Sequence, residues 1–299
     1  MQIPSIINAA LGLVLAPLLL GITNRTKAFC AGRHGPPLLQ TYYDLAKLLH
    51  KGAVYSRTTT WIFRAGPIVG LASVLVVLAV TPFGGSPAPL SFAGDLLVFA
   101  YFLGLMRFFT VVAALDTGSS FEGMGASREV LFSALAEPVL LMGLAALARK
   151  TGEISLSAII SSVSAASPEV VFVTVALLVV FLCENARIPF DDPNTHLELT
   201  MIHEVMVLDH SGPDLALIQY AAALKLWVLG ALIVGLLLPS GRELAPGMNV
   251  AVSLDAMVVL AVAVGVVESV MARLRLIRVP QLLVGAGALS ALAFLLVMR

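Results

Sequence analysis

The sequence predicts an all-α fold, a polytopic membrane helix bundle of about eight transmembrane helices, from its apolar content, its repeated spans and the turns between them. Hydrophobic residues make up 59% of the 299 residues, and the mean hydropathy is +0.97. This content far exceeds what the core of a soluble domain needs. Apolar stretches of about 20 residues, enough to cross a hydrocarbon layer of about 30 Å, recur along the chain. No soluble domain fits between them, so we expect residues 1–299 to form a single transmembrane domain.

Turn chemistry bounds the individual spans. Pro and Gly interrupt the helical pattern in "TPFGGSPAPL", "LLLPSGRELAPG" and "RVPQ". The first span lacks the basic start and the small-residue cleavage site of a secretory signal, so we expect it to be a retained helix. The predicted spans are 3–21, 63–81, 92–114, 129–148, 168–188, 215–238, 250–271 and 280–298.

Basic residues between the spans predict the orientation of the bundle. Lysines and arginines gather in residues 22–60 and again in residues 272–279. By the positive-inside rule both regions face the cytoplasm, and an even number of spans then places both termini outside. Arg149 and Lys150 do not fit this pattern. The predicted cytoplasmic loops are about 22–60, 116–128, 184–214 and 272–279.

Composition argues against several classes of function. The formal net charge is zero, so no basic face remains for nucleic acid once the cytoplasmic loops are assigned. Cys30 and Cys183 are too few for an iron–sulfur cluster, and we expect no redox centre and no catalytic residue in this chain. His196, His203 and His210 repeat every seven residues, which on one helix separates the imidazoles by about 10 Å. That distance is too long for one metal ion, and no metal site is predicted.

Charged residues inside the spans are the most informative feature. Arg107 and Lys225 fall near the middle of their spans, where an isolated charge costs a few kcal/mol and requires partners or water. Glu129, Ser133 and Glu137 lie at positions i, i+4 and i+8, which places them on one helix face. These glutamates and Glu184, at the end of the fifth span, are candidate partners.

Five carboxylates crowd residues 183–204, "CENARIPFDDPNTHLELTMIHE". Pro189 should break the fifth helix, and "FDDPN" should make a turn. A short second helix is expected at about 195–209, because Asp192 or Thr195 can cap it. Most of its residues are apolar, so its acids should be partly buried.

Two interpretations of these charges compete. They are either structural ion pairs between helices or a hydrated chain of ionisable groups that relays protons, and several in one small bundle favour the relay. Its candidate residues are Arg107, Glu129, Glu137, Glu184, Glu198, Glu204, Asp209 and Lys225.

The stretch from Glu184 to Trp227, "ENARIPFDDPNTHLELTMIHEVMVLDHSGPDLALIQYAAALKLW", resembles the membrane subunit of formate hydrogenlyase and related membrane-bound NiFe hydrogenases. That subunit belongs to the same family as subunit 1 of respiratory complex I, the NADH:quinone oxidoreductase. "GRHGPPLLQTYYDLAKLLHK", "GMGASREVLFSALAEP" and "VESVMARLRLIRVPQLL" agree, and the resemblance covers essentially the whole chain. The form "DDPNTHLELTMIHE" is similar to the hydrogenase branch rather than to the quinone-reducing branch.

The resemblance implies a membrane-anchoring and proton-coupling subunit in a prokaryotic cytoplasmic membrane. Its partners would be a NiFe hydrogenase large subunit, an iron–sulfur small subunit and an antiporter-like membrane subunit, and the NiFe centre and iron–sulfur clusters would lie in those partners. The peripheral subunits would dock on the cytoplasmic side. Residues matched to the coupling and docking loops are Asp44, Arg187, Asp191, Asp192 and Asp214.

Two other functions stay open at this point. One is the quinone-site subunit of a complex I-type enzyme, which a bound quinone would reveal. The other is a stand-alone cation-coupled transporter, although no internal repeat supports it. The electron donor, the direction of the reaction and the choice between H⁺ and Na⁺ are also open.

Overall fold

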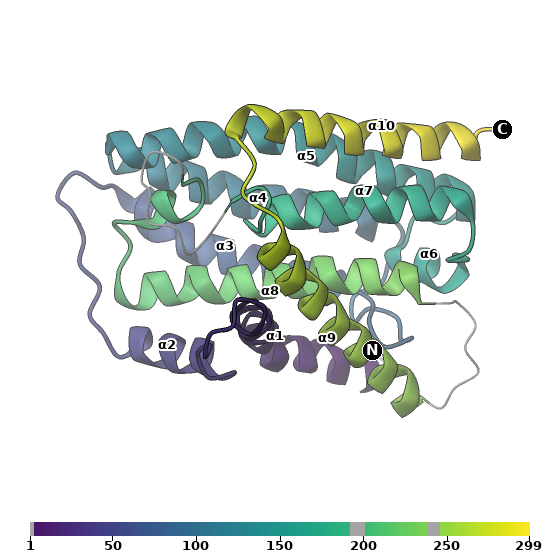
Figure 1. Cartoon of the computed structure of the whole chain (residues 1–299), viewed down its shortest axis with the longest axis horizontal. Helices are drawn as coiled ribbons and strands as arrows, with labels where there is room; N and C mark the ends of the chain where they lie inside the picture. The colour runs from purple at the N-terminus through teal and green to yellow at the C-terminus, as the bar shows by residue number, and fades with distance from the viewer. Residues whose placement is uncertain (1–2, 192–200, 239–245) are drawn as a thin grey trace.

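The computed structural model describes residues 3–191, 201–238 and 246–299, and its regular elements in these ranges are all helical (Figure 1). The α-helices are α1 (Ile3–Cys30), α2 (Gln40–Leu49), α3 (Trp61–Val80), α4 (Asp95–Asp116), α5 (Ser120–Thr151), α6 (Leu156–Ser162), α7 (Pro168–Glu184), α8 (Gly212–Leu237), α9 (Pro246–Val270) and α10 (Val279–Val297). The short 3₁₀ helices are η1 (Glu204–Val207) and η2 (Leu276–Arg278).

The predicted all-α membrane bundle is confirmed. Seven described helices are long and apolar enough to cross a membrane, namely α1, α3, α4, α5, α8, α9 and α10. The expected span 168–188 forms α7, which has 17 residues, and it supplies the eighth apolar helix of the prediction. It ends at Glu184 because the chain turns there: Ala186 has a φ of 50° and Pro189 follows. The chain is a multi-pass membrane protein.

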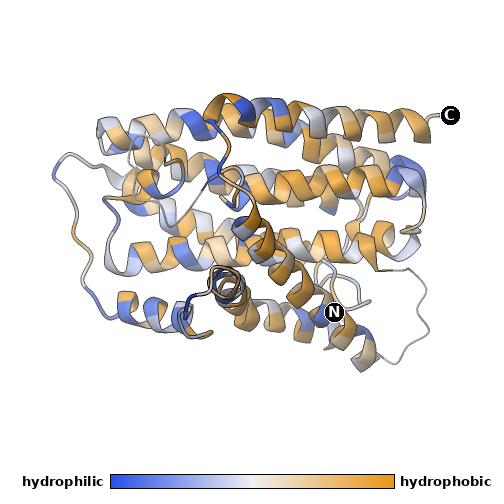
Figure 2. Cartoon of the chain, in the orientation of Figure 1, coloured by the Kyte–Doolittle hydropathy of each residue, from blue (hydrophilic) through white to orange (hydrophobic). Residues whose placement is uncertain are grey.

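The loops at one end of the bundle carry most of the basic residues of the inter-helix segments. We call this the basic end; it comprises residues 31–60, 117–119, 185–191, 201–211 and 271–278, and α2 lies there. Figure 1 shows α2 at the left, whereas α6 and both termini lie toward the right. In Figure 2 hydrophobic colour dominates the long helices, and blue patches gather more densely toward the left.

Several predicted boundaries are wrong. The predicted loop 22–60 is partly helical, since α1 continues to Cys30 and α2 follows. The predicted loop 116–128 belongs mostly to α5, which starts nine residues before the expected Glu129. Residues 120–128 are too polar and small to register as a span, but they form a helix because they pack on residues 201–207. The short helix α6 was not expected.

The prediction of a second helix at about 195–209 is also wrong for the described residues, 201–209. Residues 201–210 contain the single 3₁₀ turn η1 instead of an α-helix. Asp191 Oδ2 accepts hydrogen bonds from the backbone N–H groups of Ile202 (3.1 Å) and His203 (3.3 Å), which ties this segment to the end of the preceding turn. Residues 192–200, which include Asp192, Thr195, His196 and Glu198, lie outside the described residues.

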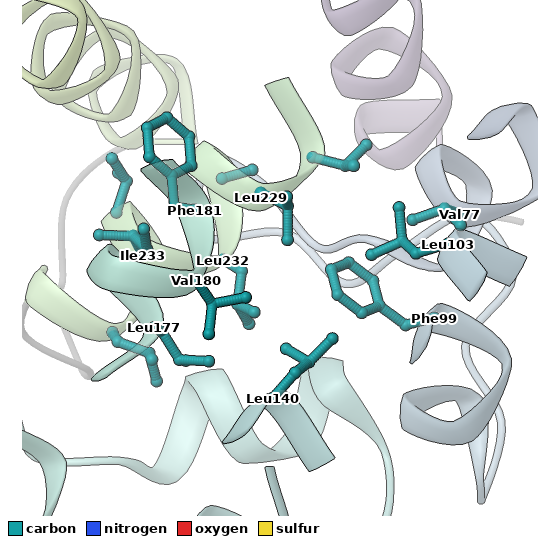
Figure 3. Packing of buried hydrophobic residues seen from close by; sticks show 14 of the residues in the cluster. Val77, Phe99, Leu103, Leu140, Leu177, Val180, Phe181, Leu229, Leu232 and Ile233 are labelled. Atoms are coloured by element: carbon teal, nitrogen blue, oxygen red, sulfur yellow. The ribbon is translucent and has the colours of Figure 1, made fainter. Parts of the chain in front are cut away.

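The apolar core surrounds α8. In the most hydropathic window of α8, 72% of residues are buried, against 28% in α9 and in the η2–α10 segment. Figure 3 shows Leu229, Leu232 and Ile233 of α8 among side chains of α3, α4, α5 and α7. α8 is therefore the central helix, and a charge on it is surrounded by the rest of the chain.

Candidate functional site

Arg107 of α4 is the centre of a buried charge cluster. Its guanidinium group contacts carboxylates from two other helices: Glu129 (3.4 Å) and Glu137 (2.6 Å) of α5, and Glu184 at the end of α7. Only 9% of the Arg107 side chain is exposed. The partners expected for a cation inside a span are therefore present, and the two α5 glutamates share a face as their spacing predicts.

Lys225 of α8 joins the same cluster. Its Nζ lies 3.8 Å from Glu184 Oε2, so Glu184 is shared between Arg107 and Lys225. Glu184 is 5% exposed, and two cations offset the cost of burying its charge. We call Arg107, Glu129, Glu137, Glu184 and Lys225 the Arg107 cluster.

Glu137 marks an open side of the Arg107 cluster. Its side chain is 46% exposed, far more than that of Glu129 or Glu184. Gly104 of α4 allows the approach, because a Cβ built at this position would lie 3.1 Å from Glu137 Oε1. Ser133, between the two glutamates in sequence, donates instead to the carbonyl of Val130 in its own helix.

Ionisable side chains continue from the cluster toward the basic end. His203 Nε2 lies 3.4 Å from Glu129 Oε2, and His203 Nδ1 lies 4.0 Å from Asp191 Oδ2. Asp191 Oδ1 in turn contacts Arg273, after α9, at 2.8 Å. We call His203, Asp191 and Arg273 the loop arm.

Among the described residues, the Arg107 cluster and the loop arm together hold eight ionisable side chains. Four carboxylates face three permanent cations, and His203 is the remaining ionisable member. Within the described residues neither ring nitrogen of His203 makes a hydrogen bond, so both positions are available for a proton or a water molecule.

Arg187 lies outside this network, although Glu184 and Asp191 are only three and four positions away from it in the sequence. Its Nη1 contacts Glu268 of α9 at 3.3 Å, and Lys27 of α1 contacts the same carboxylate at 3.7 Å. The turn after α7 directs Arg187 toward α9, whereas Glu184 faces α4 and α8. This second cluster joins α1, α9 and the 185–191 turn.

The other predicted acids are dispersed. Asp209 is exposed, and its backbone N–H donates to Glu122 of α5 at 3.0 Å. Asp44 is exposed on α2 and accepts from Gln40 at 2.8 Å. Glu204 lies in η1 and is partly exposed. Glu198 and Asp192 fall outside the described residues.

Asp214 belongs to a separate polar contact at the start of α8. It accepts a hydrogen bond from Tyr55, and this bond, with burial, raises the pKa of the Tyr55 hydroxyl. Burial lowers the pKa of nearby His210 to about 4, and its ring stacks on Phe63 with centroids 3.9 Å apart. His210 and His203 therefore occupy different environments, one apolar and one charged.

Four residues of these clusters were missed from the sequence. Glu268 lies inside the predicted span 250–271, so the rule that identified Arg107 applies to it as well. The seven-residue spacing of His196, His203 and His210 bears on metal binding and does not indicate His203 as a relay group. Arg273 and Lys27 were counted only as charges that orient the chain, and no local pattern distinguishes them from the other basic loop residues.

A cavity of about 560 Å³ lies at the opposite end of the bundle. The residues 82–87, the start of α6, the end of α8 and the start of α9 line it, and its described lining has no charged side chain. It is therefore separate from both charge clusters.

The fold and the site define a class of protein: a multi-pass helical membrane protein with a chain of ion pairs from mid-span to its basic end. Residues 3–299 match the family model of NADH dehydrogenase, and the chain belongs to that family.

Two curated relatives come from Escherichia coli (strain K12). Formate hydrogenlyase subunit 4 is 32% identical over 299 residues, covering 97% of this chain and 96% of the relative. Hydrogenase-4 component C is 33% identical over 297 residues, covering 96% of this chain and 93% of the relative. A chain in the structure of the membrane-bound sulfane sulfur reductase, an archaeal respiratory membrane complex, shares the fold with a TM-score of 0.85 at 19% identity, covering 98% of each chain.

Proposed function

We propose that this chain is the membrane subunit of a membrane-bound NiFe hydrogenase complex of the formate hydrogenlyase type. It anchors the peripheral electron-transfer subunits and links hydrogen evolution to proton movement in the membrane. The two relatives, one named as a formate hydrogenlyase subunit and the other as a hydrogenase-4 component, each match nearly the whole chain and support the hydrogenase branch. The complex would lie in a prokaryotic cytoplasmic membrane with the basic end inside, as the positive-inside rule favours.

The observation that carries the coupling role is the continuity of the Arg107 cluster with the loop arm. The series Glu137, Arg107, Glu129, His203, Asp191 and Arg273 connects a half-exposed carboxylate in a membrane span to the basic end, with every contact between 2.6 and 4.0 Å. Carboxylates and imidazoles that lie this close can exchange protons through one another or through bridging water. A purely structural ion pair would need only two of these groups.

The metal chemistry belongs to the partner subunits in this proposal. Cys30, exposed at the end of α1, and Cys183, buried in α7, are the two cysteines of the chain, fewer than the four thiolates of an iron–sulfur cluster. A NiFe large subunit and an iron–sulfur small subunit would dock on the basic end, where Asp44 and Asp214 are accessible. A change in docking or redox state there would act on Asp191 and His203, and through them on the Arg107 cluster.

The test replaces single carboxylates by amides in the intact complex. In Glu137→Gln and Glu184→Gln the shape and the hydrogen-bonding capacity stay close to native, but the titratable group is lost. The complex should still evolve hydrogen with an artificial dye donor, because those electrons do not pass through this chain. Proton translocation driven by the natural donor in sealed vesicles should fall by about tenfold or more.

Glu153→Gln serves as the matched control, since Glu153 is exposed at the opposite end, after α5. It should change neither hydrogen evolution nor acidification. If both cluster variants acidify vesicles as fast as the native complex, the Arg107 cluster is structural and the coupling role is lost. If mass spectrometry of the intact complex finds no NiFe large subunit, the hydrogenase assignment fails.

A further inference from the structure

Asp255 is a carboxylate on the outside of a membrane-spanning helix. It lies nine residues after the first residue of α9, about 14 Å along the helix axis at 1.5 Å per residue, and its side chain is exposed. Among the described residues of the membrane-spanning helices, Asp255 alone is both charged and exposed at a position more than two turns from each end of its helix. Asp255 makes no hydrogen bond or ion pair with the other described residues.

The neighbouring helix does not supply a partner for Asp255. α9 packs mainly on α1, which runs parallel to it: Gly265 approaches Thr23 and Thr26, and Val250 lies at the 81–90 loop that is bonded to Asn8. The depth of Asp255 therefore corresponds to the α1 stretch "AALGLVLAP" (9–17), which has no charged side chain. The cations of α1, Arg25 and Lys27, lie about three turns farther toward the basic end.

Asp255 sits in a continuous apolar face. The exposed residues Met248, Val258, Val259, Val262 and Val266 lie three, four, seven or eleven positions from it, which places them along one side of α9. Figure 1 shows α9 crossing the front of the bundle diagonally, and in Figure 2 it is mostly hydrophobic. We call Met248, Asp255, Val258, Val259, Val262 and Val266 the outer face of α9.

We propose that the outer face of α9 is the contact site for a membrane helix of a neighbouring subunit that presents a lysine, arginine or histidine at the depth of Asp255. Charged residues at this depth are rarely left facing lipid, because hydrocarbon offers neither a counter-charge nor hydrogen bonds. The apolar residues along the face supply packing, and the single carboxylate fixes the depth and the choice of the partner helix. This proposal rests on the proposed function only in requiring a multi-subunit membrane complex.

A second copy of this chain does not fit the outer face. Two copies inserted in the same orientation and related by a two-fold axis would place both Asp255 carboxylates at the same depth on the same patch. Like charges at short range disfavour that contact. A basic side chain from a different subunit has the complementary charge.

The first experiment places a photoreactive amino acid at Val259, one turn from Asp255, in the full complex in native membranes. The matched control carries the same group at Ala261, which is 5% exposed and faces the core. The Val259 probe should cross-link to one membrane subunit, in a peptide with a basic residue inside an apolar span, and the Ala261 probe should cross-link within this chain. Cross-links only to lipid, only to a second copy, or to a span without a basic residue would overturn the proposal.

The second experiment tests the charge. Asp255→Lys should reduce retention of that membrane subunit in mild detergent by about tenfold or more, and Asp255→Glu should preserve it. Reversing the cross-linked basic residue of the partner to an aspartate should restore retention with Asp255→Lys. Val259→Lys is the control, because it adds a cation on the same face and leaves Asp255 in place. Any loss of retention that it causes should not be restored by that reversal.

Full retention of the membrane subunit in Asp255→Lys, at equal amounts of the chain in the membrane, would overturn the proposal. The identity of the peripheral subunits is read from the same preparation and reports on the proposed function separately. A cation-bearing neighbour at Val259 in a complex without hydrogenase subunits would contradict the proposed function and support the α9 contact.

Discussion

Glu268 depends on two cations from distant parts of the chain. None of its side chain is exposed, and its oxygens lie 3.3 Å from Arg187 and 3.7 Å from Lys27. Arg187 is also buried, so the pair is shielded from water and salt, and the loss of one partner leaves an uncompensated charge. The stability of the contact between α9 and the 185–191 turn is therefore sensitive to Arg187.

We expect Arg187→Ala to lower the free energy of unfolding by about 3 to 5 kcal/mol, because it leaves Glu268 with a more distant and partly exposed lysine alone. The effect should shrink when Glu268→Gln is present in the same chain, since no buried charge then remains to be balanced. Denaturant unfolding of the purified protein in detergent measures both values.

Arg57→Ala is the control, because Arg57 is exposed in the loop before α3. Its cost should stay below about 1 kcal/mol. Equal small effects of Arg187→Ala and Arg57→Ala would show that water reaches the Glu268 pair.

At the scale of elements, the contact between α5 and η1 positions the loop arm. Gly125 of α5 lies directly under this segment: a Cβ built there would be 2.3 Å from Val205 Cγ1 and 2.9 Å from the carbonyl oxygen of Ile202. Val205 is fully buried, and the carbonyl belongs to the backbone, so neither can give way at low cost. The same backbone carries His203, which therefore depends on the absence of a side chain at residue 125.

We expect Gly125→Ala to lower the free energy of unfolding by about 1 to 3 kcal/mol, because the strain of overpacking exceeds the gain in helix propensity. It should also reduce proton translocation in the complex, since His203 moves away from Glu129. Thermal unfolding and vesicle acidification are the two measurements.

Gly123→Ala, two residues earlier in the same helix, is the matched control. Its Cβ would meet nothing closer than Leu115 Cδ2 at 4.0 Å, so helix propensity alone applies and the change should be neutral or stabilising by up to about 1 kcal/mol. A neutral Gly125→Ala would mean that the segment 201–207 does not press on α5 in the membrane.

At the scale of the whole molecule, both charge clusters lie between the middle of the bundle and the basic end. Arg107 and Lys225 mark the deepest charges, and the loop arm and the Arg187–Glu268 pair reach the turns after α7 and α9. The opposite end has the uncharged cavity and the short helix α6. This asymmetry agrees with the proposal that peripheral partners bind at one end of the bundle.

We expect a reporter inserted near Ser56 or near Arg275 to be on the cytoplasmic side and one near Ser86 to be outside, because loops rich in lysine and arginine face the cytoplasm. Arg242, in the loop predicted to lie outside with Ser86, is not among the described residues. Activity of a cytoplasm-specific and a periplasm-specific reporter at each position gives the answer. The inverted pattern would contradict the proposal that peripheral electron-transfer subunits dock at Asp44 and Asp214 on the cytoplasmic side.

The sequence by itself determined the all-α membrane class and the approximate place of the apolar helices. It also showed that Arg107 and Lys225 need acidic partners, and the spacing of Glu129 and Glu137 placed them on one face. These features could be predicted because a membrane span must be apolar over a fixed length, and because a helix repeats its faces every 3.6 residues. Both constraints act on neighbours in the chain, and a single sequence displays them directly.

Only the tertiary structure decided which charges meet. Arg187 pairs with Glu268, 81 positions away, and not with Glu184, three positions away. Residues 201–210 contain the 3₁₀ turn η1 instead of an α-helix because Asp191 and the surface of α5 hold them. The physical reason is that an ion pair depends on distances of a few ångströms between helices, and those distances follow from how the turns orient whole helices. No local pattern of residue types specifies that orientation.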